Sequence, residues 1–266
     1  MRERNQYILY LLIGIVVLIP ISRSSAAIVW SEEFENLDDW ELFGYKFAGI
    51  PPNHLHVAST PNLIIDDGVL TRNSSAQGLQ IAYRNSSVAY GTWSFDWIVD
   101  PGSEGTLIVN FIQNNHYPSS LNVSGVEYKK LNYTGYALYL EHKQGRFEFS
   151  FSKWENTDNQ TIGHQLQTQI QTREDGIHHI RIGRESNGKF TFVRNSSVIM
   201  TEIDNSFTTS EYFNLVLWGK AKIDNILVET GLHLDNSSAT RDANFPILFT
   251  FFSVGLLISM RRKREK

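Results

Sequence analysis

The stretch Trp93-Ser94-Phe95-Asp96-Trp97-Ile98-Val99 decides the fold class. Large apolar residues alternate in it with small or charged ones, and a period of two is the pattern of a β-strand with one buried face. Trp93 and Trp97 share the apolar face with Phe95. We therefore expect both indoles in the core of a β-protein.

The same alternation recurs along the chain on both sides of this stretch. Turn signals rich in Gly, Asn and Asp separate the repeats, and nothing before the last apolar segment has a helical period. The pattern predicts an all-β sandwich of two antiparallel sheets, with Gln165–Thr172 as an edge strand or a loop. The further alternating sets are Leu107, Val109 and Phe111; Phe147, Phe149 and Phe151; Ile180 and Ile182; and Phe213, Leu215 and Leu217.

The N-terminus has the three parts of a secretory signal. Arg2 and Arg4 precede the apolar run Ile8–Ile19, and small residues follow it up to Ala27. We predict a signal peptide over residues 1–27. The alternative is a retained N-terminal anchor, although the run is shorter than the roughly 20 residues that a typical span needs.

The C-terminus predicts a membrane anchor. Residues 245–260 contain no charge, and the basic tail 261–266 follows at once. Basic residues stay on the cytoplasmic side, so residues 28–232 would form an ectodomain, 233–244 a juxtamembrane linker and 245–260 a transmembrane helix. The alternative is a buried C-terminal helix of a soluble domain. The end also resembles the C-terminal sorting signals of prokaryotic surface proteins, with Asn244-Phe245-Pro246 in place of their usual motif. Exchange of the segment for a lipid stays open.

Composition excludes several classes of function. Residues 28–240 carry 15 basic and 25 acidic side chains, a net charge of −10, which disfavours binding to nucleic acid. There is no cysteine, which excludes disulfides, thiolate metal sites and cysteine nucleophiles. Secretion without cysteine favours an archaeal-type cell surface. Seven sequons predict glycosylation, at Asn73, Asn85, Asn122, Asn132, Asn159, Asn195 and Asn236.

A set of short pieces, in order and spacing, resembles the concanavalin A-like lectin and glucanase jelly roll, particularly its laminin-G-like branch. The resemblance covers roughly residues 28–230 and implies that fold, which hosts lectins, hydrolases and spacers alike. The pieces are Glu32-Glu33-Phe34-Glu35 with Asp39-Trp40, Asp67-Gly68-Val69-Leu70, Gly91-Thr92-Trp93-Ser94-Phe95, Gly135-Tyr136-Ala137-Leu138, His179-Ile180-Arg181-Ile182, Asn187-Gly188-Lys189-Phe190, and Ile223-Asp224-Asn225-Ile226-Leu227-Val228.

The resemblance implies two tests of function. The related glucanases carry Glu-x-Asp-x-x-Glu or Glu-x-Asp-x-Glu on one strand, and no such pattern occurs here, which argues against an enzyme and assigns no catalytic residue. Related jelly rolls often hold a structural calcium between their first and last strands. Here Glu33, Glu35 and Asp224 would supply its carboxylates. The alternatives are that these are solvated acids at strand ends, or that Asp224 caps a turn.

The ligand site is predicted on polar alternates of the strands. Aromatic and polar side chains on an exposed sheet face could hold a sugar, if their strands are neighbours. The candidates are Asp96, Asn110, Tyr139, Glu141, Glu148, Trp154 and Arg181. The function predicted from the sequence is a membrane-anchored surface protein that binds a glycan or another surface protein without catalysis. The alternatives are a glycoside hydrolase of the same fold and a structural component of the cell envelope.

Overall fold

The computed structural model describes residues 26–47, 56–59, 61–76, 78–115, 119–123, 126–130, 133–157 and 160–232. The predicted signal peptide before residue 26, the linker, the transmembrane segment and the basic tail lie outside these residues. No α-helix occurs in the ranges just given. Within them, no helix is long and apolar enough to cross a bilayer.

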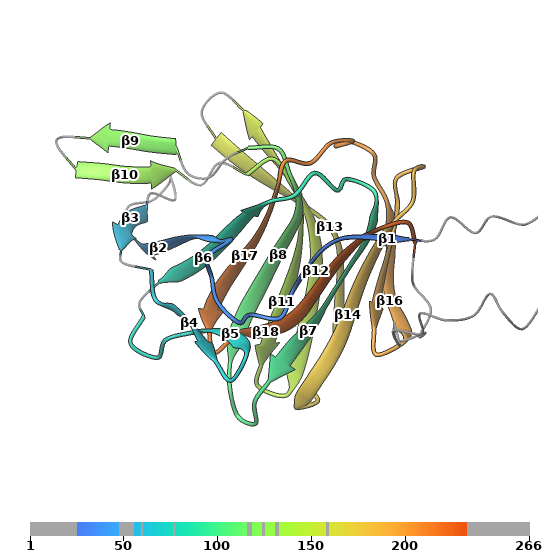
Figure 1. The fold of residues 1–266 in the computed structure, drawn as a ribbon, viewed down its shortest axis with the longest axis horizontal. Helices are drawn as coiled ribbons and strands as arrows, with labels where there is room; N and C mark the ends of the chain where they lie inside the picture. The colour runs from blue at the N-terminus through green and yellow to red at the C-terminus, as the bar shows by residue number, and fades with distance from the viewer. Residues whose placement is uncertain are drawn as a thin grey trace, which may run out of the picture. The chain divides into compact units, whose positions relative to one another are not determined.

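Two antiparallel sheets form the sandwich, as the sequence predicts (Figure 1). The eight-stranded sheet runs in the order β16 (Ser197–Ile203), β15 (Lys189–Arg194), β14 (Gly176–Arg184), β7 (Gly91–Val99), β18 (Lys222–Thr230), β5 (Val69–Arg72) and β4 (Leu63–Asp66), and β1 (Ala27–Glu32) also pairs with β18. The ten-stranded sheet runs in the order β13 (Gln160–Thr172), β12 (Arg146–Thr157), β11 (Gly135–Lys143), β8 (Gly105–Gln113), β17 (Tyr212–Gly219), β6 (Leu79–Asn85), β2 (Glu41–Phe47), β3 (His56–Ser59), β10 (Val126–Lys130) and β9 (Ser119–Val123).

The alternating apolar residues fill the space between the sheets. Trp93 and Trp97 of β7 are fully buried, which confirms their assignment to the core. Their rings meet aromatic rings of the facing sheet, with centroids 5.1 Å apart for Trp93 and Phe111 and 4.7 Å for Trp97 and Phe147. Burying such large rings supplies most of the driving force for packing the two sheets. Of the two possibilities for Gln165–Thr172, the structure shows the edge strand, because the segment lies in β13.

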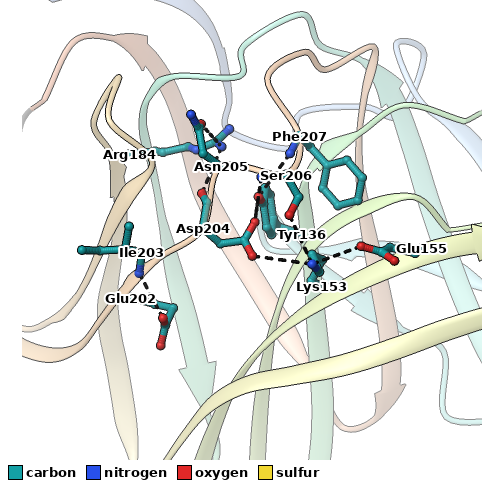
Figure 2. Close-up of polar contacts among 10 residues, drawn as sticks. All are labelled: Tyr136, Lys153, Glu155, Arg184, Glu202, Ile203, Asp204, Asn205, Ser206 and Phe207. Atoms are coloured by element: carbon teal, nitrogen blue, oxygen red, sulfur yellow. Dashed lines mark hydrogen bonds and ion pairs between the residues drawn. The ribbon is translucent and has the colours of Figure 1, made fainter.

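A connection at one end of the sandwich joins β16 of one sheet to β17 of the other, and Asp204 anchors it (Figure 2). Tyr136 of β11 donates its hydroxyl hydrogen to Asp204, and the backbone amide of Ser206 donates to the same carboxylate oxygen at 2.8 Å. The Lys153 ammonium lies 3.7 Å from the second oxygen. Burial raises the pKa of Asp204, but the bonds from Tyr136 and Ser206 and the charge of Lys153 outweigh it and lower the pKa below its usual range.

Arg184 completes this junction from β14. Its side chain is buried, and its guanidinium donates to the carbonyl of Ala89 at 3.0 Å, the carbonyl of Asp204 at 3.3 Å and the side-chain oxygen of Asn205 at 3.2 Å. The guanidinium also lies 4.6–5.1 Å from the centroids of three aromatic rings, those of Tyr90, Tyr136 and Phe190. The charge is therefore held by carbonyls and π-faces rather than by water.

The ten-stranded sheet carries a second apolar cluster on the face that points away from the core. Its buried members are Tyr45, Ile81, Tyr83, Tyr133 and Val216. Ile108 and Trp154 are partly buried against this cluster. An outward face with this much apolar surface differs from an ordinary solvated sheet face, and it adjoins the site described next.

Candidate functional site: a groove on the ten-stranded sheet

A groove of about 520 Å³ lies on the outward face of the ten-stranded sheet. Five neighbouring strands, β17, β8, β11, β12 and β13, build it, because residues two apart on a strand point to the same face and pair with such residues on the next strand. The residues that line it are Thr106, Ile108, Tyr139, Glu141, Glu148, Ser150, Ser152, Trp154, Gly163, Gln165 and Trp218.

The strand register arranges this lining in rows. Glu141 lies opposite Glu148 on β12 and opposite Thr106 on β8, and Trp218 lies opposite Thr106 in turn. In the next row, two residues along each strand, Tyr139 lies opposite Ser150. A step of two residues along a strand is about 6.6 Å, so successive rows lie within the length of one sugar ring and its linkage.

Small hydroxyl side chains lie between aromatic ones. Ser150 and Ser152 are about nine-tenths buried, while Trp218 is 52% exposed. The Trp154 ring lies at the other end of the groove, with its centroid 6.4 Å from that of Tyr139. Indole faces flanking a polar strip can hold a ring that has apolar faces and polar edges, and a pyranose is such a ring.

Each of the two carboxylates in the groove lies near a basic side chain of the same β11–β12 hairpin. Lys143 lies 2.7 Å from Glu141, and Arg146 lies 3.8 Å from Glu148. The two carboxylates are cross-strand neighbours, where like charges repel. A tyrosine phenol is protonated at neutral pH, and burial raises the pKa of Tyr139 further, so its hydroxyl can donate a hydrogen bond.

The structure brings together four of the seven predicted ligand residues, namely Tyr139, Glu141, Glu148 and Trp154. Asn110 lies on β8, one of the strands of the groove, but is buried, and its amide donates to Asn214 at 2.5 Å. That amide belongs to an interior network in which Asn214 donates to Gln113 and Gln113 donates to the carbonyl of Asn115 at 2.8 Å. Asn110 therefore supports the sheet beside the groove and does not line it.

Asp96 and Arg181 lie on the other sheet, in β7 and β14, and the structure does not bring them to the groove. Asp96 instead contacts His179 at 2.5 Å and accepts a hydrogen bond from Asn225 at 2.8 Å. Polar alternates face outward on both sheets, and the sequence does not show which strands share a sheet. That is why the seven candidates divide between two surfaces.

Sequence reasoning missed several lining residues, namely Thr106, Ser150, Ser152, Gln165 and Trp218. For Trp218 a signal was present. It falls on the alternate opposite to Phe213, Leu215 and Leu217, and these three are fully buried. A large indole on the outward alternate of a strand indicates an exposed aromatic side chain, which a ligand can contact. The Ser and Thr residues carried no such signal.

The predicted calcium ligands lie away from the groove. Asp224 of β18 pairs with Asp96 of β7. Burial raises the pKa of Asp224, and the negative charges of Asp96 and Glu33 raise it further. In the part of the chain that the structure describes, no three His, Asp or Glu side chains converge as a metal site requires. Calcium at Glu33, Glu35 and Asp224 stays a prediction.

The sequons stay predictions too. Asn73, Asn85 and Asn195 lie among the described residues, with Asn195 in the turn between β15 and β16 at a φ of 45°. Asn122 lies in β9, and the remaining three, Asn132, Asn159 and Asn236, are outside the described ranges.

The chain is similar to known proteins in its three-dimensional structure but not in its sequence. No protein-family profile matches the sequence, and no curated protein sequence matches it. The carbohydrate recognition domain of Emp47p is 10% identical, over 79% of this chain and 99% of that one, with a TM-score of 0.55. A LamA variant from Z. galactanivorans, solved with laminaritriose and laminaritetraose, is 12% identical over 77% and 99%, with a TM-score of 0.51.

The laminarinase catalytic domain from Thermotoga maritima MSB8 is likewise 12% identical, over 78% of this chain and 99% of that one, with a TM-score of 0.51. At these identities the likeness concerns architecture, and it agrees with the strand order and core described above. The described residues between 26 and 232 thus have the concanavalin A-like jelly-roll fold.

Proposed function

We propose that this chain is a membrane-anchored cell-surface protein that binds carbohydrate, without cleaving it, in the groove of its ten-stranded sheet. The observation that carries the proposal is the lining of that groove, where Trp218 and Trp154 flank a strip of Ser and Thr hydroxyls. Two proteins of similar structure support the choice of ligand class: the carbohydrate recognition domain of Emp47p and the LamA variant in complex with laminaritriose and laminaritetraose.

The energetics suit a weak, selective contact with a sugar. Each aromatic stacking contact contributes about 0.5–1.5 kcal/mol, and each neutral hydrogen bond about 1 kcal/mol net. Two indoles and a few hydroxyls therefore support dissociation constants from about tens of micromolar to millimolar. Trp218, at 52% exposure, belongs to neither the core nor the second apolar cluster of the described residues, so much of its indole is accessible to a ligand.

A glycan array probed with the full-length chain tests the proposal. We expect binding to a defined set of oligosaccharides, and at least a fivefold loss for Trp218→Ala. The matched control is Ile177→Ala, which removes another exposed apolar side chain, 57% exposed, from the outward face of the other sheet. Equal losses in both variants, or no binding to any glycan, would reject the proposal. The second result favours a structural role in the envelope.

One observation favours hydrolysis as a second candidate function. Glu141 and Glu148 are direct cross-strand neighbours in the groove, where Cβ atoms lie about 4.5–5.5 Å apart. A retaining glycosidase needs two carboxyl groups about 5 Å apart. Release of reducing sugar from the oligosaccharides that bind, abolished by Glu141→Gln or by Glu148→Gln, would establish it. Binding without release leaves the non-catalytic function.

The cell-surface location rests on the predicted signal peptide and C-terminal anchor. Protease added to intact cells should remove the β-sandwich while leaving a membrane-bound C-terminal fragment. A sandwich that resists protease until the cells are lysed would contradict the location and leave the groove without access to external glycans.

A further inference from the structure

Gly163 and Trp154 face each other across the β12–β13 hairpin, and both line the groove. A Cβ atom on Gly163 would lie 2.7 Å from Cη2 and from Cζ3 of Trp154, and 2.9 Å from Cε3. Real Cβ atoms do not approach other heavy atoms this closely. The benzo ring of Trp154 thus occupies the space that any side chain at position 163 would take.

The backbone does not explain this glycine. The φ of Gly163 lies outside the left-handed region, so its conformation is open to every residue type. Glycine weakens a strand, because it costs more conformational entropy and packs no side chain. A glycine in a long edge strand therefore points to the close approach of another group, and here that group is an indole.

A β-bulge brings the two residues into line. The register of β12 and β13 shifts by one residue between Phe151 and Ser152. Without this shift, the pairing of Phe151 with Gln167 would continue to His164 opposite Trp154. Because of the bulge, Gly163 rather than His164 lies opposite Trp154, which leaves space for the indole ring. Bulges commonly change the direction of side chains in this way.

We propose that Gly163 is a positioning residue. It fixes the Trp154 ring beside the sheet as the wall on which a sugar ring stacks. The inference rests on the proposed carbohydrate function and adds a specificity element to it, because a side chain at position 163 pushes the indole into or away from the groove. Trp154 contacts the ligand, and Gly163 acts through Trp154.

The test is a double-mutant cycle on the full-length chain. Gly163→Ala should displace the ring, shift the indole N–H resonance of Trp154 and weaken binding of the best array oligosaccharide about tenfold. A Trp154→Phe background has only a single ring and lacks the outer, fused ring of the indole that approaches position 163. In that background Gly163→Ala should change affinity less than twofold, because the effects of two coupled residues are non-additive. Trp154→Phe also assigns the resonance. Ile162→Ala, beside Gly163 and outside the groove lining, should leave both readouts unchanged.

Two results overturn the inference. One is an unshifted Trp154 indole resonance in Gly163→Ala. The other is an equal loss of affinity from Gly163→Ala in both backgrounds, since a merely structural glycine acts regardless of the ring. Failure of the wild-type chain to bind any glycan rejects the proposed function and the stacking role with it, and the resonance then reports separately on whether Gly163 positions the indole.

Discussion

The junction around Asp204 and the groove on the ten-stranded sheet contain the same kinds of side chain. Each has aromatic rings, carboxylates and hydroxyls, and β11 contributes a tyrosine to each, Tyr136 to the junction and Tyr139 to the groove. In the junction these groups bind one another across three strands and a loop (Figure 2). In the groove some also pair, as Ser150 does with Thr168 at 2.7 Å and Glu141 with Lys143 at 2.7 Å, but the lining borders an open volume of about 520 Å³. Polar groups that only bind one another stabilise the fold, and those that border an open volume can also be reached by a ligand.

Among the variants of the junction and the groove, Arg184→Leu should have the largest effect on stability. The change removes a buried guanidinium and leaves the carbonyls of Ala89 and Asp204 without their donor. We expect the free energy of unfolding to fall by about 3 kcal/mol, because each buried acceptor left without its donor costs about 1–3 kcal/mol. Urea denaturation measures it. The folded fraction should bind glycan as the wild type does, and a stable protein with impaired binding would contradict the division of roles.

Acid should destabilise the core beneath the groove. His142 follows Glu141 on β11 but faces inward, and burial lowers its pKa to about 4, helped by the charge of Arg173. A folded-state pKa below the unfolded value of about 6.5 means that stability is complete above pH 6.5 and is lost as pH falls towards 4. The expected loss is roughly 3 kcal/mol.

His142→Leu isolates that contribution. Because the variant has no imidazole at this site, its stability should depend less steeply on pH between 6.5 and 4 in urea titrations. Burial also lowers the pKa of His178, which keeps part of the slope in the variant. Identical slopes in the two proteins would show that His142 titrates normally in the folded state.

The two tyrosines of β11 offer a symmetrical test. Tyr136→Phe deletes the bond to the Asp204 carboxylate and should cost about 2 kcal/mol of stability with no change in affinity. Tyr139→Phe deletes a groove hydroxyl and should weaken glycan binding about fivefold with no change in stability. Calorimetry of unfolding and of binding measures both. If Tyr136→Phe weakened binding and Tyr139→Phe lowered stability instead, the ligand would not bind on the face of β11 that carries Tyr139.

The smallest expected effect concerns charge in the groove. Glu148→Gln removes the repulsion between Glu148 and Glu141, at the loss of an exposed ion pair with Arg146 that contributes little. We expect a gain of about 0.5 kcal/mol in the free energy of unfolding at low salt, which shrinks at high salt. A loss of stability would mean that the pair with Arg146 outweighs the repulsion.

The sandwich could be predicted from the sequence because burial of one strand face produces a pattern within a few consecutive residues. Alternation in Trp93–Val99 and in Phe147–Phe151 follows directly from strands with one buried face. The site is not local. Tyr139 and Asp96 carry the same polar-alternate signal, and only the strand order separates the groove from the opposite sheet. The burial of Asn110 against Asn214 is equally non-local, because the two residues are 104 positions apart in the chain.

The location of the ligand is best tested by a crystal structure with the strongest-binding array oligosaccharide. We expect sugar rings in the groove of the ten-stranded sheet, with one ring against Trp218 and one against Trp154. Ligand bound on the outward face of the eight-stranded sheet, near Asp96 and Arg181, would contradict it.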